Sequence, residues 1–189
     1  MDTVSPSLPA ALGDRSLQDY LPREIPEAFI RKYFTLTDAD LAEIERCRGS
    51  VNKLGFAVQL CTLRWQGHFL PDTRDLPPVV LEMLAQQLGV LPLPIPDYPQ
   101  NEKTRWEHLE RIREHLGFVK YDDTARQQLL RYVQERAATV PRLTVLQTLA
   151  CQWLYTARVV RPGRTTLRDS LAALGKPPSR RCMRQSIAG

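Results

Sequence analysis

The sequence predicts an all-α protein of about seven or eight helices, an arrangement compatible with two helix-turn-helix-like clusters. Apolar residues recur at spacings of three and four along most of the chain, which is the period of an amphipathic helix. No pair of strands or hairpin is evident. With 43% hydrophobic and 25% charged residues in 189 positions, the chain has the composition of one good-sized globular domain or two small ones.

Prolines suggest how the chain is divided. Residues 1–25 are rich in Pro, Ser and Asp and are expected to form a partly mobile leader. A first helical cluster is expected over 26–91 and a second over 101–175. The proline run in 92–100 cannot continue a helix and predicts a stiff connector between them. Residues 176–189 form a basic tail.

Local signals mark the helices of the first cluster. Pro26 suits the start of a short helix, because its missing N–H costs little there. Thr37 is expected to cap a second helix, whose dipole favours the acidic Asp40 in the first turn. Gly49 is a candidate stop. Residues 51–65 carry so wide an apolar surface that they predict a central, buried helix.

The later helices have similar boundary signals. Gly89 and Gly117 are expected to end two of them, and Asp122 or Asp123 to cap the helix that follows Gly117. The expected spans are 76–88, 101–116, about 122–138, 143–160 and 164–174.

Charge is unevenly distributed and favours nucleic acid as the partner. Residues 1–45 carry 4 basic and 9 acidic residues, whereas 46–189 carry 22 and 12. Arginine supplies 21 of the 26 cations, and its planar guanidinium suits phosphate oxygens and guanine edges. The four cysteines show no metal-binding spacing, so no metal or cofactor is expected. Without a signal peptide or a bilayer-spanning stretch, a cytoplasmic protein with no membrane partner is predicted.

Helix 101–116 is the first candidate for DNA contact. Its apolar side comprises Trp106, Leu109, Ile112 and Leu116. Its other side comprises Thr104, His108, Arg111 and His115. A helix lying in a groove of DNA would display such a polar stripe, although an ordinary solvated face is an alternative. Arg105 lies near the edge of the apolar arc and would reach a phosphate from the helix start, where Lys103 is also a candidate.

Two further basic clusters are candidates. Arg48, Asn52 and Lys53 surround a glycine turn and the start of the next helix, where phosphate binds well. The alternative is that Arg48 interacts with a helix dipole and Asn52 caps a helix. Arg64, further along the same helix, is also a candidate. The alternative is that its apolar stem covers the apolar surface of this helix while its guanidinium reaches the water. The other cluster strengthens phosphate contact without reading sequence, and comprises Arg158, Arg161, Arg164, Arg168, Arg180, Arg181 and Arg184.

Three stretches resemble the amino-terminal domain of Tn-three family transposases. They are Y-F-T-L-T-D-A-D-L at 33–41, R-G-S-V-N-K-L-G-F-A-V-Q-L-C-T-L-R at 48–64 and T-R-W-E-H-L-E-R-I-R-E-H-L-G-F at 104–118. The resemblance implies a helical domain that binds double-stranded DNA at the terminal inverted repeats of class II transposons. It also favours a DNA-binding role for the candidates in the last two stretches. Residues 167–169 depart from the expected Leu-Glu pairing, and 176–189 show no resemblance.

No catalytic activity is predicted for this chain. It lacks nucleotide-binding, serine-hydrolase and zinc-protease motifs. The resemblance places the catalytic Asp, Asp and Glu of these transposases in a far downstream domain that no segment here matches. The sequence therefore predicts a DNA-binding part of a transposase, with a second copy of the chain as a candidate partner. A helical protein-interaction module acting in transposase assembly or regulation is the alternative, and a poorly folding remnant is a third hypothesis.

Overall fold

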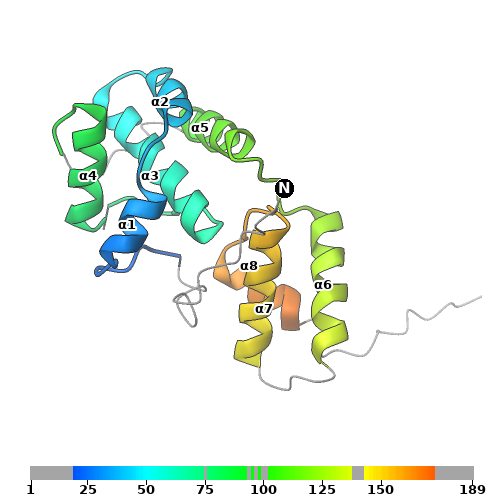
Figure 1. Cartoon of the computed structure of the whole chain (residues 1–189). Coiled ribbons are helices and arrows are strands. Elements are labelled where there is room, and N and C mark those ends of the chain that lie inside the picture. The colour runs from blue at the N-terminus through cyan, green and yellow to red at the C-terminus, as the bar shows by residue number, and fades with distance from the viewer. Residues whose placement is uncertain are drawn as a thin grey trace, which may run out of the picture.

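The computed structural model describes residues 19–74, 76–92, 95, 98, 102–137 and 143–172. These residues form α-helices and no strand or sheet, which confirms the all-α prediction (Figure 1). The helices are α1 (Glu27–Tyr33), α2 (Asp38–Glu45), α3 (Ser50–Gln66), α4 (Pro78–Leu88), α5 (Glu102–His115), α6 (Asp123–Ala137), α7 (Leu143–Thr156) and α8 (Arg164–Ala172). None of them is both long and apolar enough to cross a bilayer.

Helix α3 is the centre of the larger group of helices, as its wide apolar surface predicts. It packs against α1, α2, α4 and α5, which surround it in Figure 1. Phe56, Leu60 and Leu63 are completely buried in this core. Because almost all of α3 after its first turn is buried, this helix cannot lie in a groove of DNA along its length.

The predicted capping and stop signals account for the start of α2 and the ends of α4 and α5. Thr37 Oγ1 accepts from the Asp40 N–H, and an Asp40 carboxylate oxygen accepts from the Thr37 N–H at 2.8 Å, which closes a capping box. Gly89 and Gly117 adopt left-handed φ angles of 64° and 67° just after α4 and α5, so both predicted stops are confirmed. Gly49 instead precedes α3 directly, since α2 already ends at Glu45.

Helices α6, α7 and α8 form a second group, in which α6 packs against both others. Helix α7 ends at Thr156, so the prediction that it reaches residue 160 is wrong. Arg158 adopts a left-handed φ of 54°, and the chain beyond it runs beside Val119. The Val119 N–H donates to the Arg158 carbonyl at 2.7 Å, and the Val160 N–H donates to the Val119 carbonyl at 2.9 Å.

Helix α5 packs against α3, although the sequence groups it with the later helices. The connector before it contributes buried Ile95 and Tyr98, so its described residues are part of the core. Most of the predicted leader, the rest of the connector and the basic tail lie outside the described residues. The proposed domain division stays a prediction.

Candidate nucleic-acid interface

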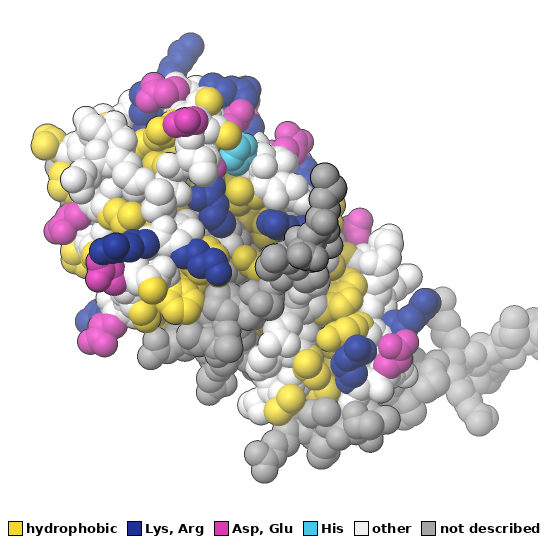
Figure 2. Space-filling view, viewed as in Figure 1, with side chains coloured by type: hydrophobic (Ala, Val, Ile, Leu, Met, Phe, Trp, Pro, Cys, Tyr) yellow, Lys and Arg dark blue, Asp and Glu magenta, His cyan; other side chains and the backbone are white. Residues whose placement is uncertain are grey.

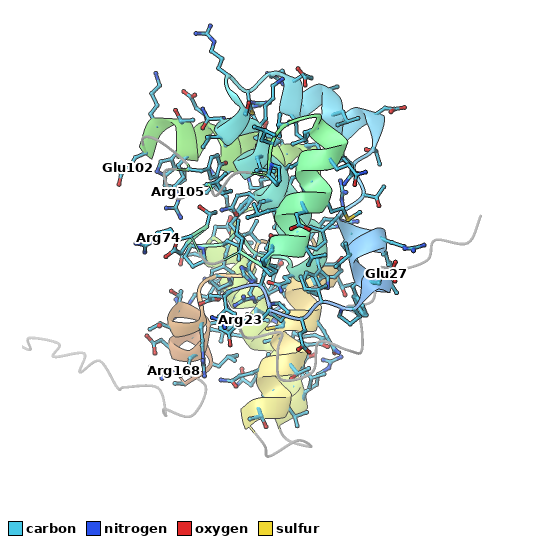
Figure 3. All side chains as sticks on the ribbon, turned by 90° about the vertical axis from the view of Figure 1, so that its left-hand side faces the viewer. Arg23, Glu27, Arg74, Glu102, Arg105 and Arg168 are labelled. Carbon is cyan, nitrogen blue, oxygen red and sulfur yellow. The ribbon has the colours of Figure 1, made fainter. Side chains whose placement is uncertain are left out.

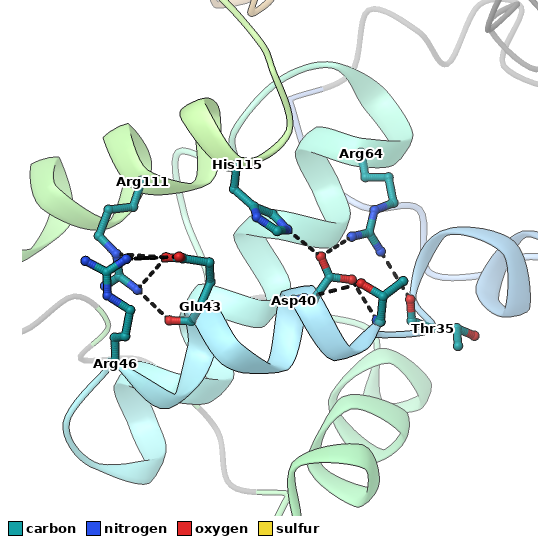
Figure 4. Close-up of polar contacts among 8 residues, drawn as sticks. Thr35, Asp40, Glu43, Arg46, Arg64, Arg111 and His115 are labelled. Carbon is teal, nitrogen blue, oxygen red and sulfur yellow. Dashed lines mark hydrogen bonds and ion pairs between the residues drawn. The ribbon is translucent and has the colours of Figure 1, made fainter. Parts of the chain in front are cut away.

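The Asp40 carboxylate joins three helices. It is 1% exposed, and one of its oxygens contacts Arg64 Nη2 at 2.6 Å and His115 Nε2 at 2.8 Å (Figure 4). Burial by itself raises the pKa of Asp40, but hydrogen bonds from the Thr37 backbone, Arg64 and His115 outweigh burial and lower it. Arg64, a predicted DNA contact, is therefore part of the link between α2 and α3.

A second ionic cluster fixes Arg111 in the space between α5 and α2. Its Nη2 lies 3.0 Å from a Glu43 carboxylate oxygen (Figure 4). Its guanidinium also lies over the Phe56 ring, 4.8 Å from the ring centroid. Arg46 contacts the same carboxylate at 2.9 Å. The guanidinium of Arg111 thus faces the protein and holds α5 in place.

His108 lies even deeper, at 6% exposure. Its Nδ1 is 3.1 Å from the Tyr98 hydroxyl, and its Nε2 is 3.6 Å from Cys47 Sγ. Burial, and then the charge of Arg111, lower the pKa of His108, so it is neutral near pH 7. The predicted outward stripe is wrong, because His108, Arg111 and His115 face the core. Trp106, placed on the inward side by its apolar character, is 66% exposed.

A groove of about 800 Å³ lies between α5 and the turn from α2 to α3. It brings together two sequence clusters that were predicted separately, around Asn52 and around Thr104. Four basic and two acidic side chains line it, so its walls carry a net positive charge. The lining residues are Arg46, Cys47, Arg48, Asn52, Thr104, Trp106, Glu107, His108, Glu110, Arg111 and Lys120.

Some of the basic side chains of the groove are held in ion pairs with acidic residues, and one forms no ion pair within the described part of the chain. Arg46 pairs with Glu43, and Lys120 pairs with Glu110 at 3.0 Å. Arg48 is exposed and forms no ion pair with any described residue. Asn52 Nδ2 donates to the Arg48 carbonyl at 3.0 Å, while the buried Asn52 Oδ1 has no hydrogen-bond partner among the described residues. Arg48 and Asn52 are thus the polar groups of this groove that the described fold leaves least satisfied.

The remaining predicted contacts divide between surface and interior. Lys103 is 86% exposed, although its ammonium is within 3.9 Å of Glu107. Arg105 is half-buried near the start of α5 and lies along one edge of the molecule in Figure 3. Arg164 is exposed at the start of α8. Lys53 pairs with Glu45 at 2.6 Å.

Arg161 was expected to contact phosphate from the surface, but its side chain is 2% exposed. It forms an ion pair of 3.0 Å with Asp19, whose other oxygen accepts from the Arg164 N–H. Asp19 therefore links the start of the described chain to Arg161 and to the first residue of α8, and the burial of the Arg161 side chain excludes its surface contact with DNA. Over α2 and α5, at the top of Figure 2, basic and acidic side chains are interleaved.

Sequence reasoning missed the outer face of α6. This helix buries Ala125, Leu129 and Val133. Its opposite face comprises the exposed residues Thr124, Gln127, Gln128, Arg131, Gln134 and Glu135. Arg131, at its centre, forms no ion pair with any described residue. The outer face of α5 carries Glu107 and Glu114 instead. The helical spacing of Ala125, Leu129 and Val133 is the sequence signal that could have found this face.

The fold and these surfaces define an all-α protein with available cations on the α2–α3 turn and on α6. Residues 14–174 match the family described as "Domain of unknown function (DUF4158)". The chain belongs to this family.

Curated relatives of the chain are transposases. It is 32% identical to the transposase for transposon Tn1546 of Enterococcus faecium over 76% of the chain, and 33% identical to that for Tn501 of Pseudomonas aeruginosa over 69%. It is 35% identical to the transposase for transposon gamma-delta of Escherichia coli (strain K12) over 73%. These matches cover 15%, 13% and 14% of the three relatives, and they confirm the resemblance to Tn-three family transposases.

Proposed function

We propose that the chain binds double-stranded DNA and recognises the terminal inverted repeats of a transposon, as the amino-terminal part of a transposase. The relatives are named as transposases, which supports a role in transposition. The proposal assigns recognition of DNA to this chain and does not assign cutting or joining of strands to it. It also assigns the protein to the cytoplasm.

The outer face of α6 is the observation that carries this proposal. Fifteen residues at about 1.5 Å per residue give a rod of roughly 22 Å, which suits the major groove. Gln127 and Gln128 offer the paired donor and acceptor that match adenine, and Arg131 offers the paired donors that match guanine. Because the other face of α6 is packed against α7 and α8, the fold holds these side chains on a rigid helix.

Phosphate contacts would position this helix on the duplex. Of the residues predicted from the sequence, Arg48, Lys103, Arg105 and Arg164 retain exposed or half-exposed side chains and are proposed for this role. The cations held in ion pairs with buried or half-buried partners are proposed to orient the helices instead; they are Arg64, Arg111 and Arg161.

A mobility-shift assay at fixed salt tests the proposal with an inverted-repeat duplex and a scrambled duplex. The wild type is expected to prefer the inverted repeat. Arg131→Ala should reduce the preference for the inverted repeat. The difference in binding free energy between the two duplexes should shrink by about 1–3 kcal/mol, the value of one contact that reads a base pair. Arg168→Ala removes the same charge from the exposed surface of α8 and should weaken both complexes equally.

Equal affinity of the wild type for the two duplexes would refute sequence recognition. An unchanged affinity ratio in Arg131→Ala would instead refute the role of α6.

A protein-interaction module is the second candidate function, and Leu91 favours it because this side chain lines a small, largely apolar hollow with Val51, Leu54 and Ile95. The Leu91 side chain is 72% exposed after α4. Light scattering separates the two candidates. A stable complex of several copies that binds neither duplex would support the interaction module and refute DNA binding.

A further inference from the structure

Trp106 stands where a large apolar side chain is unexpected. It lines the groove between α5 and the α2–α3 turn, yet 66% of its surface is exposed. The other two tryptophans are in or against the core, Trp65 at 2% exposure and Trp153 packed partly buried. Proteins that bind single-stranded nucleic acid combine an exposed aromatic ring with a positively charged groove, because the bases stack on the ring while the cations contact the phosphates.

We propose that this groove holds one unstacked nucleotide of the bound DNA, with its base on the Trp106 indole and its phosphate at Arg48. This inference rests on the proposed DNA binding and adds that one nucleotide of the bound DNA is displaced from the base stack. Asn52 lines the groove, and its Oδ1 has no hydrogen-bond partner among the described residues. Rotation of this carboxamide toward the groove would let Oδ1 accept a hydrogen bond from the exocyclic amine of the base.

The size of the groove favours a nucleotide over a duplex. A hollow of about 800 Å³ is in the range of pockets that enclose a small ligand. A double helix, whose major groove alone is about 12 Å wide, cannot enter it. Only a nucleotide displaced from the base stack would reach both the hollow and the indole at its rim.

The charges of the groove favour a nucleotide over an apolar peptide. Four basic side chains oppose two acidic ones in the lining, and Arg48 has no described acidic partner. An apolar segment on Trp106 would cover Arg48 and Asn52 without meeting their charge and hydrogen-bonding needs, which is unfavourable. A nucleotide satisfies the aromatic surface, the cation and the acceptor together.

The test compares the full chain on a paired inverted-repeat duplex and on the same duplex with one extrahelical 2-aminopurine nucleotide. The extrahelical base should tighten binding by roughly 5- to 150-fold, as one base–aromatic stack of about 1–3 kcal/mol does. It should also change the 2-aminopurine fluorescence. Trp106→Leu should abolish the gain without altering affinity for the paired duplex, whereas Trp106→Phe should keep part of it. Tyr20→Leu is the matched control, since it removes an exposed aromatic ring that lies outside the groove lining, and it should keep the full gain.

A single-stranded hexanucleotide with one 2-aminopurine separates this proposal from duplex recognition. If it binds the wild type but not Trp106→Leu, while no duplex binds, the proposed function is refuted and the groove proposal stands. If the paired duplex binds with sequence preference and the extrahelical base adds nothing, the groove proposal is overturned alone. An equal gain in wild type and Trp106→Leu also overturns it.

Discussion

The buried Asp40 carboxylate is expected to be a main source of stability, because it links α2, α3 and α5. We predict that Asp40→Ala lowers the free energy of unfolding by about 3–5 kcal/mol, the usual cost of removing one partner of a buried ion pair. The change leaves Arg64 and His115, each about one-fifth exposed, without their shared acceptor. It also opens the capping box of α2.

That loss is large against a total stability of roughly 5–15 kcal/mol. For a chain of this size it corresponds to a decrease in melting temperature of roughly 6–20 °C. Circular dichroism at 222 nm measures the melting curve directly, because all the described secondary structure is helical.

The matched control is Asp72, which contacts Arg74 at 2.6 Å, the same distance as Asp40 to Arg64. Asp72 is on the surface, where water and salt screen the pair, so Asp72→Ala should melt close to wild type. Equal decreases in the two variants would refute the argument that burial makes the Asp40 cluster important.

The pH dependence follows from the lowered pKa of Asp40. A carboxyl whose pKa is lower in the folded than in the unfolded state contributes stability above the unfolded value of about 3.9. That contribution is lost as the pH falls through the folded value. The melting temperature of the wild type should therefore fall toward the Asp40→Ala value below about pH 4, and parallel curves for the two proteins would contradict the linkage.

Three further results are expected. Gly55→Ala should destabilise the fold by about 1–3 kcal/mol, because a Cβ at this position would clash with the Tyr98 ring, although alanine favours a helix more than glycine does. In a double-mutant cycle of melting curves, Tyr98→Leu should reduce this loss of stability. Cys61 should resist labelling by a thiol reagent until the chain unfolds, since burial raises its pKa to about 12, and early labelling in peptide mass spectra would contradict this. The logarithm of the duplex association constant should fall linearly with the logarithm of salt concentration, and Arg48→Ala should make that slope shallower by about one in a fluorescence-anisotropy titration.

Much of the fold could be predicted because its signals are local. Thr37 and Asp40 are three residues apart and form the predicted cap without help from the rest of the chain. Gly89 and Gly117 end helices because glycine reaches left-handed angles at little cost. The early end of α7 was missed because its cause is not local, as Val119 meets Val159 from 40 positions away.

The orientation of α5 could not be predicted from its own residues. Hydropathy places Trp106 inside and His108 outside, and the structure shows the reverse. The polar side chains are buried because partners far along the chain satisfy them: Cys47 lies 61 positions from His108, and Asp40 lies 75 from His115. Burying a polar group without a hydrogen bond costs free energy of desolvation. In α5 this cost is offset by hydrogen bonds to residues that only the tertiary fold brings near.

The same contacts change the meaning of the charge asymmetry. The acidic excess of residues 1–45 suggests a separate acidic region beside a basic one that requires a polyanion. In the folded chain, Asp19, Asp40 and Glu43 are counterions to arginines from the basic part. Part of the positive charge is therefore neutralised internally before any DNA arrives. What remains for DNA is set by which cations lack such partners, and this points to Arg48 and Arg131 rather than to the arginines that the sequence makes most conspicuous.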